Sequence, residues 1–189
     1  IQNLYPTRKE HHMPEHLSKD EIKRMIQATD NIKHTCILEL LYSGGLRLSE
    51  LLNIEISDVN TNTMALRIRM TKANKERKVI LSNVLHGDLE TYLKVYKPEK
   101  YLFEGQQKEQ YSAKSVQNVV KSAAQRAEIT KHVTPHTLRH SFAIHLLESG
   151  TDIHIIQELL GHESVKTTEK YTQMADISKL SIPNPLDTL

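Results

Sequence analysis

Residues 134–172 read TPHTLRHSFAIHLLESGTDIHIIQELLGHESVKTTEKYT, and this stretch decides the fold. Thr134-Pro135 predicts a helix start, because a hydroxyl side chain caps the first turn and proline lacks an N–H that this turn leaves unpaired anyway. Gly150 and Gly161 suit the left-handed backbone that follows a helix end. We therefore expect one helix that ends before Gly150, and a second that starts at Thr151 and stops at Gly161.

The same short helices carry four side chains that are candidates for a catalytic role. His136 and Arg139 are three residues apart, so they share one face of the first helix. His162 directly follows the second glycine stop, and Tyr171 is expected on a third short helix that Ser164 caps. Sharp breaks between short helices put the four within reach of one pocket.

A further arginine follows a pair of glycines upstream. Residues 43–51 read SGGLRLSEL, in which Gly44-Gly45 ends an apolar helix predicted over residues 32–43. Arg47 then starts the next helix. Glu50 is three residues further on, so its carboxylate can brace the guanidinium.

Alternating side chains predict a small antiparallel sheet. Residues 64–70 (MALRIRM) alternate apolar and basic, which is typical of a strand with one wet, basic face. Residues 77–81 (RKVIL) are its expected partner, with a short third strand near residues 57–60. Lys72 and Lys75 lie at the tip of this hairpin, where a loop can reach into a groove.

Taken together, these motifs resemble those of the tyrosine recombinases (phage integrase family). The resemblance rests on SGGLRLSEL, TKANKER, H-x-x-R, and L-G-H followed by a tyrosine nine residues later, in that order, and covers about residues 18–180. Four such boxes in order are far more specific than one. The Xer-like and mobile-element integrase branches are the most similar. The resemblance implies a mainly α (α+β) fold, a helical catalytic domain with a small three-stranded antiparallel sheet.

The resemblance also implies a catalytic set: Arg47, Lys72, His136, Arg139, His162 and the nucleophile Tyr171, with Glu50 in support. The arginines would hold the non-bridging oxygens of a DNA phosphate, and the tyrosine would form a covalent 3′-phosphotyrosine. His136 would act as general base, Lys72 would protonate the leaving 5′-oxygen, and His162 would hydrogen-bond the phosphate. Lys75, on the same hairpin tip, is the competing candidate for the functional lysine.

The resemblance implies double-stranded DNA as the partner, and the distribution of charge is compatible with it. The net charge is only +2, but residues 61–131 hold 14 Lys and Arg against 7 Asp and Glu. This excess is expected if one face meets a polyanion, but without the motifs a solvated lysine-rich surface would be the favoured explanation. The expected DNA contacts lie on the hairpin and on the outer face of a helix over residues 112–128: Arg67, Arg69, Lys75, Arg77, Lys114, Gln117, Asn118 and Lys121.

The remaining segments define the expected domain organisation. Residues 1–17 are expected to be a linker from an N-terminal core-binding domain that this sequence lacks, residues 18–175 the catalytic domain, and residues 176–189 a tail. That tail either packs on a neighbouring protomer or folds back. The resemblance implies a homotetramer on paired DNA sites, from a protein that is a monomer when isolated.

No cofactor, metal or membrane is expected. His136 and His140 have a spacing that can grip a metal, but no glutamate follows the first histidine and Arg139 between them would repel a cation. Cys36, the only cysteine, lies in an apolar run and is expected to be a buried thiol, which fits a reducing cytosol. No stretch has the length and apolarity of a membrane span.

The predicted function is site-specific DNA recombination and integration by cutting and rejoining strands. A type IB topoisomerase shares the arginine, lysine and tyrosine chemistry, and a DNA-binding regulator could keep the fold without catalysis. Both alternatives stay open from the sequence.

Overall fold

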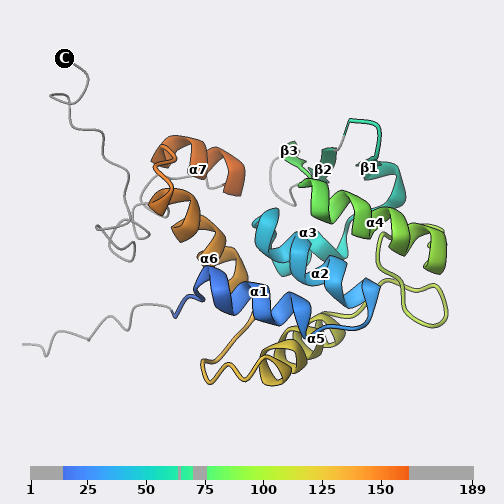
Figure 1. Cartoon of the computed structure of the whole chain (residues 1–189). Helices are drawn as coiled ribbons and strands as arrows, with labels where there is room; N and C mark the ends of the chain where they lie inside the picture. The colour runs from blue at the N-terminus through green and yellow to red at the C-terminus, as the bar shows by residue number, and fades with distance from the viewer. Residues whose placement is uncertain (1–14, 64, 70–75, 162–189) are drawn as a thin grey trace, which may run out of the picture.

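The computed structural model describes residues 15–63, 65–69 and 76–161 (Figure 1). The fold class is as predicted, mainly helical with a small antiparallel sheet. Its elements are α1 (Lys19–Gln27), α2 (Ile32–Ser43), α3 (Leu48–Leu52), the 3-10 helix η1 (Ile56–Asp58), β1 (Val59–Asn60), β2 (Ala65–Arg69), β3 (Glu76–Ile80), α4 (Asn83–Tyr96), α5 (Ala113–Arg126), α6 (Pro135–Glu148) and α7 (Ile153–Leu160).

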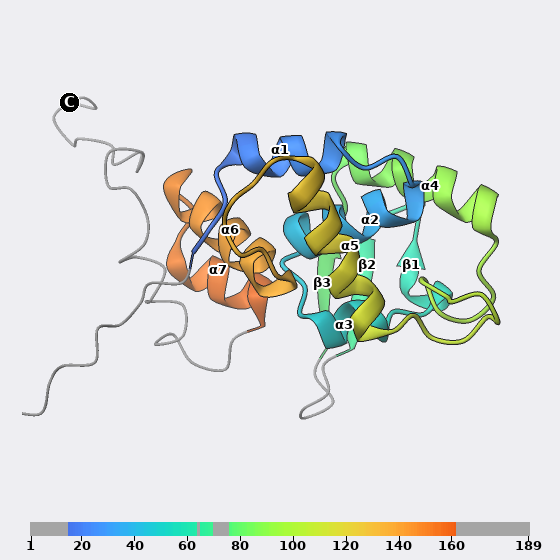
Figure 2. The ribbon, with the colours of Figure 1, turned by 90° about the horizontal axis from the view of Figure 1, so that it is seen from below.

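Helix α2 lies at the centre of the molecule, packed against α1, α3, α4, α5 and α6 (Figures 1 and 2). The middle of its sequence is mostly apolar with no polar face, and a helix segment of that kind must be covered all round. Residues 36–41 are accordingly buried, including the predicted buried thiol of Cys36. A second, smaller cluster of buried side chains joins α6 to α7: Ala143, Ile144, Ile156 and Leu160.

The sheet has the strand order β1-β2-β3 with antiparallel pairing throughout. Leu66 pairs with both Val59 and Val79, and Arg67 pairs with Lys78. Leu66 and Ile68 are buried, which confirms the predicted alternation of β2. Residues 70–75, which join β2 to β3 and carry Lys72 and Lys75, lie outside the described residues.

Local capping signals set the ends of the helices that carry the site. The Thr134 hydroxyl accepts from the N–H of Thr137, with proline at the first helical position, as predicted for α6. Gly161 ends α7 with a φ of +63°. The start of α7 differs from the prediction, because the carboxylate of Asp152, not the Thr151 hydroxyl, accepts the N–H of His154 at 2.8 Å.

Residues 15–17, at the end of the expected linker, pack against the domain. Leu17 is fully buried, and its N–H donates to Oγ of Ser141 on α6 at 2.9 Å. The Ser18–Glu21 capping box predicted for α1 is present. No helix in the described part of the chain is long and apolar enough to cross a membrane.

One buried acid in the core has an unfavourable environment. Glu39 on α2 is 5% exposed and faces Asp88 on α4. Burial and the neighbouring Asp88 carboxylate raise the pKa of Glu39 to about 8, from an ordinary value of 4.5. The folded protein thus keeps a proton that the unfolded chain has lost above pH 4.5. Stability must therefore fall as the pH rises from about 4.5 to about 8.

We expect Glu39→Gln to stabilise the protein at pH 8, because the amide needs no proton to stay neutral and can still hydrogen-bond Asp88. The gain should be roughly 1–3 kcal/mol at pH 8 and should shrink toward zero near pH 4.5. Urea unfolding at both pH values measures it, with Glu90→Gln on α4 as the control. An equal effect of Glu39→Gln at both pH values would contradict this assignment.

Candidate active site

The turn between α2 and α3 places the first arginine. Gly45 has a φ of +53°, and a Cβ there would lie 2.7 Å from Cδ1 of Phe142 and 2.8 Å from Cδ2 of Leu160. Only glycine fits so tight a contact with left-handed backbone. Arg47 follows as the N-cap residue of α3, with its side chain 36% exposed.

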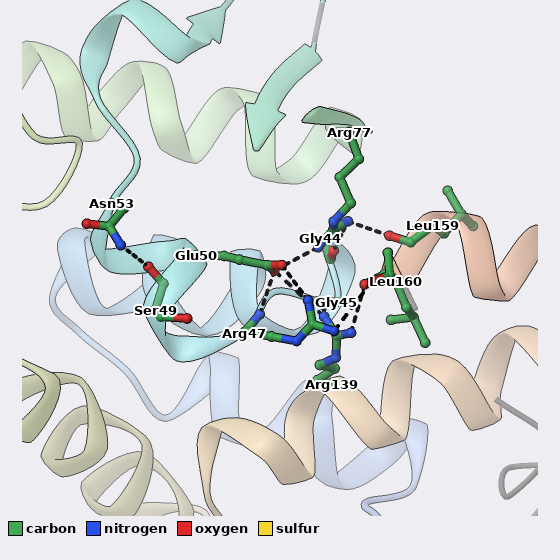
Figure 3. Close-up of polar contacts among 11 residues, drawn as sticks. Gly44, Gly45, Arg47, Ser49, Glu50, Asn53, Arg77, Arg139, Leu159 and Leu160 are labelled. Carbon is green, nitrogen blue, oxygen red and sulfur yellow. Dashed lines mark hydrogen bonds and ion pairs between the residues drawn. The ribbon is translucent and has the colours of Figure 1, made fainter. Parts of the chain in front are cut away.

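Glu50 lies at the centre of the cluster that this turn forms (Figure 3). Its side chain is 4% exposed. Oε1 accepts from Nη1 of Arg47 at 2.9 Å, while Oε2 accepts from the Arg47 backbone N–H at 2.9 Å and from Nη2 of Arg77 at 3.0 Å. Nη1 of Arg139 lies 3.7 Å from the same Oε2. The predicted supporting carboxylate thus contacts both predicted catalytic arginines.

The charge state of Glu50 follows from these neighbours. Burial by itself would raise the pKa of the carboxyl group. The positive charge of Arg77, the hydrogen bond from the Arg47 N–H and the charge of Arg139 outweigh it and hold the pKa below its ordinary value. The cluster therefore keeps one carboxylate ionised among three guanidinium groups.

Arg139 lies in the second turn of α6 and is 3% exposed. Its guanidinium donates to the carbonyl of Gly45 and, at 2.8 Å, to the carbonyl of Leu160 at the end of α7 (Figure 3). The second predicted arginine therefore joins the turn after α2 to α7. A guanidinium with N–H groups in a fixed fork suits both carbonyl and phosphate oxygens.

His136 lies one turn before Arg139 and is exposed. Its ring stacks on His140, with centroids 6.1 Å apart. Burial, then the charges of His136 and Arg139, lower the pKa of His140 to about 4, so His140 is neutral at pH 7. Within the described residues, no three histidine, cysteine or carboxylate side chains are grouped so as to bind a metal ion.

An open groove of about 850 Å³ connects His136 to the outer face of α5. The helix contributes four side chains that the sequence predicted as DNA contacts, all exposed: Lys114, Gln117, Asn118 and Lys121. Leu48, the residue after Arg47, also lines this groove. The groove thus brings together the polar stripe of α5, the start of α6 and the start of α3.

The hairpin arginines have partners that the sequence reasoning missed. Arg67 and Arg69 are 42% and 44% exposed, and both bind Oδ1 of Asp58, at 2.8 and 2.9 Å. Asp58 is itself 4% exposed. Its carboxylate shares its charge between the two arginines, so this strand is less basic than its sequence suggests.

Arg77 departs most from its expected place. We expected it to contact DNA, but its side chain is 8% exposed and pairs with Glu50. The strand alternation explains this, because Arg77 lies on the same face of β3 as buried Val79. The alternation within RKVIL was the sequence signal for an inward-facing arginine.

The rest of the predicted catalytic set, Lys72, His162 and Tyr171, lies outside the described residues, as do Lys75 and the tail over residues 176–189. By chain order, His162 directly follows Gly161, the residue that ends α7. The described part of the site is therefore a cluster of three arginines around one carboxylate, beside a histidine in an open groove.

Comparisons with known proteins bear on the family and the fold. The phage integrase family model matches residues 15–177. Tyrosine recombinase XerA of Pyrococcus horikoshii is 43% identical over 166 residues, which cover 86% of this chain and 58% of that protein. The crystal structure of XerA recombinase aligns with a TM-score of 0.82 at 36% identity, over 89% of this chain and 63% of that one.

A structure of the XerH site-specific recombinase bound to its palindromic difH substrate aligns with a TM-score of 0.79. The alignment covers 87% of this chain and 51% of that chain at 23% identity, so it shows a shared fold. The chain spans less than two thirds of the length of the relatives it matches here.

We expect Gly45→Ala to destabilise the protein by roughly 2–4 kcal/mol, because the new methyl group meets Phe142 and Leu160 on strained backbone. Urea unfolding measures this change. Gly87→Ala on α4 is the matched control, since nothing lies within 4 Å of its added Cβ. That control should gain about 0.5–1 kcal/mol from helix propensity. Equal stability of Gly45→Ala and the parent would show that this turn is not under the described constraint.

Proposed function

The chain belongs to the phage integrase family, and from this premise we propose that it is the catalytic domain of a site-specific tyrosine recombinase. It would cut and rejoin DNA strands in recombination and integration. The observation that carries the proposal is the cluster in which Glu50 contacts both Arg47 and Arg139, beside the groove that His136 lines.

The proposed reaction begins at an anionic phosphodiester with a poor leaving group. Arg47 and Arg139 donate N–H groups to the non-bridging oxygens and offset the charge that grows on them. Losing one such preorganised donor costs about 3–4 kcal/mol of transition-state stabilisation. Glu50 supports both arginines by fixing where their guanidinium groups lie.

The other proposed residues move the electron pairs and protons. The Tyr171 oxygen attacks phosphorus while His136 accepts its proton, and the bond to the 5′-oxygen breaks as Lys72 protonates that oxygen. His162 donates a hydrogen bond to the phosphate. The 3′-phosphotyrosine keeps the bond energy, so the 5′-hydroxyl of another strand can attack it without a nucleotide cofactor.

Double-stranded DNA is the proposed substrate, held partly by the α5 stripe in the groove. We propose that the protein acts in the cytoplasm as a homotetramer on paired sites, is a monomer when isolated, and serves a mobile element. The tail over residues 176–189 would then pack on a neighbouring protomer. Because the relatives are named as recombinases, neither a topoisomerase nor a non-catalytic regulator is favoured.

The nucleophile is tested with nicked suicide substrates made from the ends of the protein's own genetic element. The full-length protein should give a slow-migrating, protease-sensitive band on a denaturing gel, and Tyr171→Phe should give none, because it lacks the attacking oxygen. DNA binding by the variant, measured by gel shift, is the control. An equal band with Tyr171→Phe would show that another residue is the nucleophile.

The groove is tested by the salt dependence of DNA binding. Lys114→Gln and Lys121→Gln should each weaken binding about equally for all DNA sequences, and should reduce the slope of log K against log salt by about 1. Fluorescence anisotropy over a range of KCl concentrations measures both. Lys94→Gln, an exposed site on α4, is the control. Unchanged slopes for both groove variants would place the DNA elsewhere.

A further inference from the structure

Arg77 is a buried arginine to which the proposed reaction gives no role. Its Nη2 donates to Oε2 of Glu50 at 3.0 Å, and its Nη1 donates to the carbonyls of Gly44, at 3.4 Å, and of Leu159. Its Nε has no hydrogen-bond partner among the described residues. With 8% of its side chain exposed and both terminal nitrogens engaged, Arg77 is poorly placed to reach a phosphate.

The contacts of Arg77 repeat those of the catalytic arginine Arg139, one residue earlier in each segment. Arg77 binds the carbonyls of residues 44 and 159, and Arg139 binds those of residues 45 and 160 (Figure 3). Arg47 completes the series with a 3.5 Å contact to the Gly161 carbonyl. The three guanidinium groups therefore join the turn after α2 to the last carbonyls of α7.

These carbonyls are natural partners for cations. The last turn of a helix leaves its carbonyl groups without intrahelical donors, and the helix dipole makes this end negative. The arginine contacts fix where α7 ends, and the residue that follows Gly161 is the predicted catalytic His162. A change at Arg77 would shift both this helix end and the Glu50 carboxylate.

Arg77 also determines how Glu50 shares its negative charge. Oε2 lies 3.0 Å from Nη2 of Arg77 but 3.7 Å from Nη1 of Arg139, which is beyond hydrogen-bond distance. Because Arg77 takes the closer position, Glu50 orients Arg139 without forming a tight pair with it. More of the positive charge of Arg139 then remains for an anionic ligand.

We propose that Arg77 is a positioning residue for the phosphate-binding arginines, acting through Glu50 and the end of α7 without contacting DNA. This inference rests on the proposed recombinase function. The competing role is purely structural: Arg77 would hold β3 to α7 and would affect stability alone.

The test measures single-turnover formation of the covalent complex by the full-length protein at saturating suicide substrate. Arg77→Gln should slow it about 10–100-fold, the cost of misplacing catalytic groups, while the Kd for DNA changes less than about threefold. Arg77→Lys should recover part of the rate, because it keeps the charge beside Glu50 but loses the fork. If Arg77→Gln does not fold, the rate and Kd of Arg77→Lys decide.

A double-mutant cycle with Glu50→Gln separates the two roles. If Arg77 acts through Glu50, the double variant should be no slower, within about twofold, than the slower single variant. Arg24→Gln is the matched control. It removes an arginine that also donates to a carbonyl of another helix, at 2.7 Å to Ala127, without touching Glu50. Its rate constant should equal that of the parent.

Three outcomes would overturn the inference. Rate losses that multiply in the double variant would show independent action. An unchanged rate constant with a lower Tm for Arg77→Gln would show that Arg77 has a structural role alone. A slope of log K against log salt reduced by about 1 would make Arg77 a direct DNA contact. A parent protein that forms no covalent complex would instead overturn the proposed function, and this inference with it.

Discussion

The ionised carboxylate of Glu50 is the constraint on which the site depends. A buried carboxylate costs several kcal/mol unless it is paired and hydrogen-bonded. Here its partners come from three places in the chain: Arg47 before α3, Arg77 on β3 and Arg139 on α6. Because all three must converge on one side chain, the positions of the sheet, α3 and α6 are fixed relative to one another.

The same guanidinium groups also hold the end of α7. Helices α6 and α7 share a small apolar cluster of their own, which includes Leu160 in the last turn of α7. The carbonyls of Leu159 and Leu160 accept from Arg77 and Arg139 and add polar contacts to this packing. Protein carbonyl oxygens thus accept from N–H groups that, in the proposed reaction, would bind a phosphate. Such a phosphate would compete with these contacts or add to them, depending on how rigidly Glu50 holds each arginine.

The basic residues in the middle of the sequence do not all present their charge at the surface to the same extent. The two hairpin arginines share the carboxylate of Asp58, and Arg69 also pairs with Glu55 at 3.2 Å, so two carboxylates offset the charge of these two basic residues. The lysines of α5, by contrast, stand exposed along the groove that leads to His136. This contrast favours α5 over the sheet as the main electrostatic contact in the proposed complex with DNA.

The sequence by itself determined what depends on neighbours along the chain. It predicted the bounds of α2, the start of α6 at Thr134, the glycine stop at Gly161 and the alternation of β2, because caps, left-handed glycines and side-chain periodicity act within a few residues. The three-residue spacing of Arg47 and Glu50 also predicted the contact between them. Only the tertiary structure decided the partners of Arg77, the sharing of Asp58 and the pairing of Glu39 with Asp88. Those contacts join residues 9 to 82 positions apart, and nothing local specifies which distant group will fill a buried position. Packing of the helices and the sheet around α2 makes that choice.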